Sequence, residues 1–193
     1  MTTKVQCSCS QTKMLVDYVK ATHPENLDRL WLPIQGELPE NQDPEEFLRD
    51  PKNRISHEAL RIMMEQTRKA TFDDMAVYKA ALASDKRSEP GGALKRRFRV
   101  FFGPKNTVQE VLEGSPFLLG NRPEIHSLSD THAVVRLRWA NNLILSSDFC
   151  HFAKGQYQAV PSWFDLAPAR LWERMCFFKG GPWCEYEIWW DRR

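Results

Sequence analysis

The chain has 193 residues, of which 42% are hydrophobic and 27% charged, and its formal net charge is only +2. This length and composition suit one soluble domain with a real core. The small net charge, with acidic and basic residues interspersed, argues against a nucleic-acid interface that rests on gross charge. The sequence contains no apolar run long enough to span a membrane and no apolar signal core in its first residues. We therefore expect a cytoplasmic protein that binds neither a membrane nor nucleic acid directly.

The N-terminal stretch predicts one helix and a long loop. Residues 1–10 are polar, and we expect them to be flexible. Residues 11–21 carry an apolar stripe at helical spacing. Residues 32–55 contain four prolines, which indicates a loop with one short helix around 45–49.

Further helices are expected before the middle of the chain. Ser56 is an expected N-cap of a helix over 57–69, and Thr71-x-x-Asp74 resembles a capping box that opens another helix. Residues 93–113 are expected to form two helices around a Gly-Pro break.

The second half of the chain changes to a period of two, which is typical of strands. Residues 124–139 read as a hairpin, 148–159 as a helix, and 170–178 and 183–190 as two strands joined by a tight turn. Short connections make both strand pairs antiparallel. The predicted fold is therefore α+β: an antiparallel sheet of two hairpins joined by a helix, with the N-terminal helices packed against it.

Four residues of this half suggest a metal centre. Cys150, Glu173, Cys176 and Cys184 supply three sulfurs and one carboxylate, which suits a closed, structural zinc site. Residues three apart in a regular strand point to opposite faces, so a bulge or the strand end must lie between Glu173 and Cys176. His151 is the alternative fourth ligand, and three buried structural thiols are the plain alternative to zinc.

The same four residues, the Gly180-Gly181 turn and the closing segment 184–190 resemble the vinyl-4-reductase-type sensory domain. That domain is also the effector-binding module of phenol- and xylene-responsive bacterial transcription activators. Residues 121–139 and the helix-rich stretch from Asn53 resemble, more loosely, sensory modules that precede histidine kinases and cyclases. The resemblance covers about 53–190 and implies a zinc-containing sensory domain that encloses a ligand between helices and sheet. The activators recognise phenols with an upstream histidine, which 97–103 lack, so a phenolic ligand is not implied.

This resemblance divides the chain into two parts. Residues 53–193 are expected to form the vinyl-4-reductase-like domain with its structural Zn²⁺. Residues 1–52, a helix and a proline-rich loop, match nothing in that family, and we expect them to serve dimerisation. Cys7-x-Cys9 lies in this part, and a flexible N-terminus without function is favoured there over metal or redox chemistry.

A ligand site is predicted ahead of and within the first hairpin. Aromatic side chains are concentrated there, and such residues either line a buried pocket or fill a core. The candidate ligand-binding residues are Phe98, Phe101, Phe102, Phe117, His126 and Trp139.

The sequence thus favours a cytoplasmic sensor that binds a small apolar or aromatic molecule and acts in signal transduction. A homodimer and a downstream output domain are the expected partners. The alternatives are an enzyme or enzyme accessory of the vinyl reductase type and a scaffold without ligand. An enzyme is disfavoured because the chain lacks a glycine-rich dinucleotide loop, a nucleophile elbow and an HExxH motif.

Overall fold

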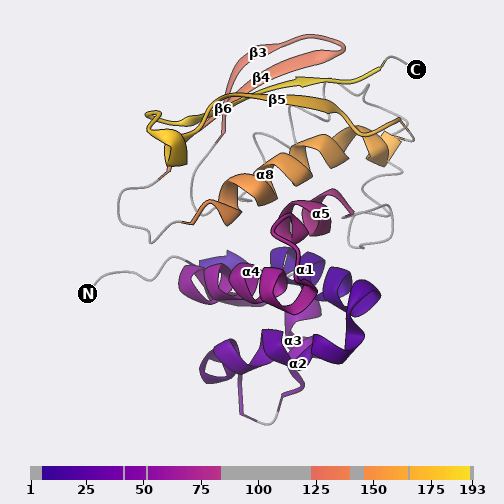
Figure 1. Ribbon diagram of the computed structural model, residues 1–193, viewed down its shortest axis with the longest axis vertical. Helices are drawn as coiled ribbons and strands as arrows, with labels where there is room; N and C mark the ends of the chain where they lie inside the picture. Colours follow the sequence, from indigo (N-terminus) through magenta and orange to yellow (C-terminus); the bar gives the residue numbers. More distant parts are fainter. Residues whose placement is uncertain are drawn as a thin grey trace.

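The computed structural model describes residues 6–40, 42–50, 52–83, 123–139, 146–164 and 166–191. These residues form layers: a four-stranded sheet, a helix beneath it, and a group of N-terminal helices beneath that helix (Figure 1). The expected helices within 93–113, and with them Phe98, Phe101, Phe102 and Phe117, lie outside the described residues.

The N-terminal layer is helical apart from one short strand pair. Its helices are α1 (Cys9–Thr22), α2 (Asp28–Trp31), α3 (Pro44–Arg49), α4 (His57–Thr71) and α5 (Ala76–Leu82), with 3₁₀ turns at Pro24–Asn26 and Leu32–Glu37.

Regular secondary structure begins closer to the N-terminus than the sequence predicts. Strand β1 (Gln6–Ser8) pairs antiparallel with β2 (Arg54–Ser56). Cys7 and Cys9 are 4% and 0% exposed and belong to the hydrophobic core. The expectation of a flexible segment therefore fails for residues 6–10, because this stretch buries both sulfur side chains and pairs its backbone.

Helix α4 begins as predicted, but α5 does not. The Ser56 hydroxyl accepts a hydrogen bond from the Ala59 backbone N–H, as an N-cap should. Thr71 ends α4 and bonds back to the Thr67 carbonyl, so it opens no capping box. The Asp73 carboxylate accepts the Met75 N–H ahead of α5 instead.

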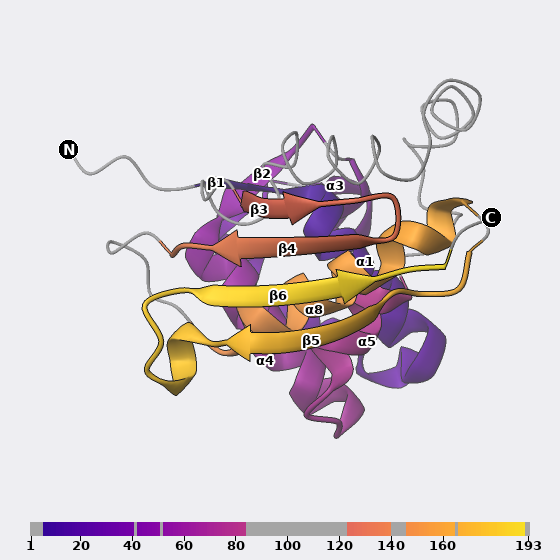
Figure 2. The ribbon, with the colours of Figure 1, turned by 90° about the horizontal axis from the view of Figure 1, so that it is seen from above.

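The sheet has the predicted pair of hairpins. Strands β3 (Glu124–Leu128), β4 (His132–Leu137), β6 (Cys184–Trp189) and β5 (Arg170–Met175) lie in the order β3–β4–β6–β5, and every neighbouring pair is antiparallel (Figure 2). The α+β prediction is confirmed. The third strand is shorter than predicted, because a bulge follows Glu173 and a 3₁₀ turn forms at Phe177–Lys179.

Helix α8 (Asp148–Ala159) joins the two hairpins and lies between the sheet and the N-terminal helices (Figure 1). Its buried side chains include Phe149, Phe152 and Tyr157. Gly155 lets α5 approach closely, since a Cβ at that position would lie 2.4 Å from the Tyr78 carbonyl oxygen. The Tyr78 hydroxyl donates to Gln158 Oε1 at 2.8 Å across the same contact. Among the described residues, no helix is long and apolar enough to cross a membrane.

Candidate functional site

Three cysteines meet where α8 contacts the second hairpin. Cys150 comes from α8, Cys176 follows β5 and Cys184 begins β6, and their three sulfur atoms lie within 4.8 Å of one another. We call these three residues the thiol cluster. All three are buried, so the cluster fixes α8 to the sheet from within the core.

The sulfur atom of Cys184 receives hydrogen bonds from two N–H groups of the protein. It lies 3.1 Å from Cys150 Sγ and accepts the Phe177 backbone N–H and the Trp139 indole N–H, each at 3.3 Å. The hydrogen bond from Cys150, followed by the two N–H donors, lowers the pKa of Cys184 to about 6 despite its burial. The same bond and desolvation raise the pKa of Cys150. Cys150 therefore keeps its proton and donates it towards a Cys184 thiolate.

Glu173 does not join the thiol cluster. Its carboxylate is bound by the ammonium groups of Lys154 and Lys179, the latter 2.6 Å from Oε1. Burial raises the pKa of Glu173, but the two lysines outweigh it and hold the pKa below its usual value. The carboxylate is thus fully used in ion pairs, and His151 is not part of the cluster either.

Aromatic rings continue from the cluster into the N-terminal layer. The Trp139 ring packs on Phe149 of α8 with centroids 6.0 Å apart, and Phe149 stacks on His57 of α4 at 4.8 Å. His57 is 6% exposed, and its Nε2 is buried without a hydrogen-bond partner. Burial lowers the pKa of His57, so the ring is neutral and serves packing.

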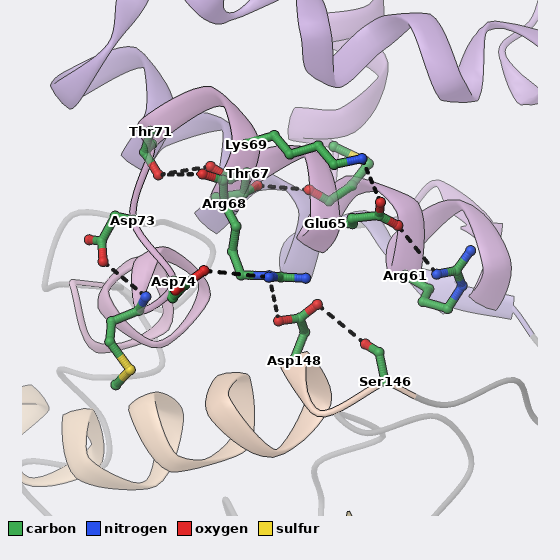
Figure 3. Close-up of polar contacts among 12 residues, drawn as sticks. Arg61, Glu65, Thr67, Arg68, Lys69, Thr71, Asp73, Asp74, Ser146 and Asp148 are labelled. Atoms are coloured by element: carbon green, nitrogen blue, oxygen red, sulfur yellow. Dashed lines mark hydrogen bonds and ion pairs between the residues drawn. The ribbon is translucent and has the colours of Figure 1, made fainter.

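An ion pair also joins α4 to the start of α8. Arg68 Nε lies 2.9 Å from Asp148 Oδ1, and the Asp148 side chain is only 3% exposed. Arg68 also reaches Asp74 at 3.7 Å, and the Ser146 hydroxyl donates to the second oxygen of Asp148 at 3.4 Å (Figure 3). Asp148 lies in the first turn of α8, where the helix dipole favours a negative charge.

The structure separates the predicted ligand-binding residues that it describes. Trp139 is buried at 7% exposure beside the thiol cluster, whereas His126 is exposed on β3. The four phenylalanines lie outside the described residues, so the predicted pocket stays a prediction. Sequence reasoning missed His57, Arg68 and Asp148. An acidic residue in the first turn of the predicted helix was a signal for Asp148, but nothing marked its partner on α4.

The fold resembles solved structures of H-NOX proteins over nearly the whole chain. An H-NOX protein from S. oneidensis in the Fe(II) ligation state matches with a TM-score of 0.64 and 13% identity, covering 96% of each chain. An oxygen-binding H-NOX domain related to soluble guanylate cyclases matches with a TM-score of 0.61 and 8% identity, covering 94% of this chain and 93% of that one. The unliganded Fe(II) H-NOX protein from K. algicida gives 0.58 and 10%, covering 96% and 97%. No family model and no curated protein matches the sequence.

These comparisons correct two predictions. The resemblance to the vinyl-4-reductase-type domain is wrong as an assignment, because the similar structures are H-NOX domains, a different sensory domain. The prediction of a structural zinc ion is wrong as well. Several of the similar proteins concern haem or its iron, and the carboxylate required as the fourth zinc ligand is held by two lysines. The three cysteines do lie together, as expected. The carboxylate that was assigned as the fourth ligand does not join them.

Proposed function

We propose that this chain is a small-molecule-sensing regulatory domain and not an enzyme. The observation that carries the proposal is the position of α8, which is bound on one side to the sheet and on the other to the helical layer. The likeness to H-NOX proteins, which include an oxygen-binding domain, supports a binding role for the same arrangement of layers. A ligand that binds one packing of the layers better than another shifts the population between them.

The contacts of α8 are of two kinds, and this asymmetry supports the proposal. Towards the sheet, α8 is held by the thiol cluster and by Phe149 against Trp139, all within the buried core. Towards the helices, Phe149 stacks on His57 and Gly155 packs closely on α5. Two polar contacts are added on this side: the ion pair of the buried Asp148 with the partly exposed Arg68, and the Tyr78–Gln158 hydrogen bond. The donors and acceptors of such polar contacts can form hydrogen bonds with water or other polar groups instead, an exchange that a packed apolar core does not offer. The junction between α8 and the helices is therefore the part that a ligand is expected to rearrange.

The proposed ligand is a small organic molecule. The proposed lining residues are the aromatic side chains of the sequence prediction: Phe98, Phe101, Phe102, Phe117 and Trp139. Haem is the cofactor that several of the similar structures concern, but the donor side chains of this chain do not fit a ligated haem iron.

A thermal-shift screen of a panel of small organic molecules, metabolites included, tests this function. We expect at least one compound to raise the unfolding temperature in a saturable way, because a ligand that binds the native state stabilises it by mass action. Phe101→Ala should weaken that response. Phe72→Ala is the control, since Phe72 is 80% exposed at the end of α4. If no compound binds and Phe101→Ala changes nothing, a scaffold replaces the sensor.

A further inference from the structure

Proteins hold haem iron through histidine, cysteine, methionine or tyrosine. The chain has five histidines, five cysteines, six methionines and four tyrosines. Every one of them except Met1 lies in the part of the chain that the structure describes, and residues 84–122 contain none of the four types. The environment of each potential iron ligand can therefore be inspected.

Three of the histidines lie away from the interior. His23 follows α1 and lies 3.2 Å from a carboxylate oxygen of Glu25. His126 is exposed on β3. His132 Nε2 lies 2.8 Å from Glu187 Oε1, on the face of the sheet that is turned away from α8. Among the residues that the structure describes, none of these three rings is buried.

The two remaining histidines are His57 and His151. His57 Nε2 has no hydrogen-bond partner, but protein atoms close it off on every side, and its ring is stacked on Phe149. An iron atom bound to that nitrogen would bring a macrocycle into space that side chains already fill. His151 Nδ1 is closed off in the same way. The rest of the His151 ring is half-buried among charged groups, Lys154 and Glu173 included, where an apolar macrocycle is poorly accommodated.

The cysteines are enclosed as well. Cys184 is 0% exposed, and its sulfur already has contacts with Phe177 N–H, the Trp139 indole and a second thiol. Cys7 and Cys9 are buried, and burial raises their pKa values to about 12 and about 11. A thiolate is the form that binds iron, and burial opposes that form at Cys7 and Cys9. Cys184, whose pKa is lowered, is instead shut off by its full burial.

Tyrosine and methionine offer no better ligand. Tyr78 donates its hydroxyl to Gln158, and the rings of Tyr157 and Tyr186 pack on each other in the core, where burial raises both pKa values. Met63 and Met64 are 0% exposed within α4. The other described members of the two types are partly or largely exposed: Tyr18, Met14, Met75 and Met175.

We infer that this chain uses an H-NOX-like fold without a protein-ligated haem iron, so that its ligand is an organic molecule held by packing and hydrogen bonds. This inference rests on the proposed sensory function and narrows its ligand class. In place of an iron ligand, the Phe149 ring of α8 stacks on His57 of α4 and also packs against Trp139, which follows β4.

Titration of the purified full chain with haemin, followed by gel filtration and absorbance, tests the inference. We expect no stoichiometric haem to stay with the protein, or haem whose spectrum and nitric-oxide adduct show no axial nitrogen or sulfur from the protein. Retention of one haem per chain with such an axial ligand would overturn the inference. His57→Ala and His151→Ala would then identify the ligand, and His126→Ala is the matched exposed control.

The haemin titration and the thermal-shift screen together separate this inference from the proposed function. A ligated haem would overturn the inference but leave a sensory domain in place. A chain that retains no haem and also binds none of the organic compounds in the thermal-shift screen would support the inference and end the proposal of a sensor.

Discussion

Gly155 is the residue on which the contact between α5 and α8 depends. A Cβ there would lie 2.4 Å from the Tyr78 carbonyl oxygen and 2.7 Å from Ala81 Cβ. Because backbone atoms of α5 would have to move, the close approach of the two helices requires glycine at this position.

Gly155→Ala should therefore destabilise the protein by about 1–3 kcal/mol, the usual cost of overpacking, even though alanine is the better helix former. Urea denaturation measures the change. Gly36→Ala is the matched control, since nothing lies within 4 Å of a Cβ at Gly36. Equal stability of the two variants would show that α5 and α8 are not packed as described.

Phe72 has an unfavourable backbone conformation at the end of α4. It adopts φ 53° and ψ 33° while its side chain is 80% exposed, so little packing offsets the strain. Phe72→Gly should stabilise the protein by about 1 kcal/mol, because glycine adopts the left-handed region without a Cβ clash. A lower denaturation midpoint in this variant would contradict the left-handed conformation of residue 72.

His57 gives the fold a predictable sensitivity to acid. Its pKa is lowered in the folded state by burial, so the unfolded chain binds the proton more readily. Its contribution to stability is present above the ordinary pKa of histidine, about 6.5, and is lost as the pH falls towards the folded-state value.

The loss of stability on acidification should be smaller in His57→Phe, which keeps an aromatic ring against Phe149. Denaturation midpoints measured across the weakly acidic range check this. His126→Phe, on an exposed strand position, should keep the wild-type pH profile. If both variants follow the wild type, His57 is not a buried neutral histidine.

At the scale of elements, α8 is the centre of the molecule. Its first turn carries Asp148, whose carboxylate is 3% exposed, while the Arg68 side chain that pairs with it is 34% exposed. Removing one member of a buried pair leaves the other without its partner, and this cost is greater for the more buried group.

Arg68→Met should therefore destabilise the protein more than Asp148→Asn, by roughly 2–3 kcal/mol against about 1 kcal/mol. In the first variant a carboxylate stays buried without its cation, whereas in the second the guanidinium can turn to water. Lys79→Met, which removes an exposed pair with Asp73, is the control and should change little. The reverse order of the two α8 variants would contradict the burial of Asp148.

Elements with strong local patterns were predictable from the sequence. Helix α8 has the predicted bounds, and Ser56 caps α4 as its side chain chemistry requires. The strand β1 was not predictable, because its three residues are extended only through pairing with β2, which is distant in the sequence and begins at Arg54. The failed capping box at Thr71 shows the same limit, since a local motif is overridden when the preceding helix extends through it.

At the scale of the whole molecule, the sequence predicted the topology better than the chemistry. The two hairpins and their linking helix followed from periodicity and short connections. The site did not, because Glu173 was chosen as the fourth zinc ligand from ligand type, spacing and family resemblance, and none of these can show that Lys154 and Lys179 bind its carboxylate. The homodimer and the output domain remain predictions.

Native mass spectrometry of the full chain, purified without denaturant, tests whether this domain binds a small organic molecule and no haem. We expect a population of chains that carry one small organic molecule, without the mass or absorbance of haem. That molecule, added back to stripped protein, should raise the unfolding temperature. A chain that retains ligated haem would contradict the claim about the ligand, and a chain that carries and binds nothing would contradict the claim of a sensor.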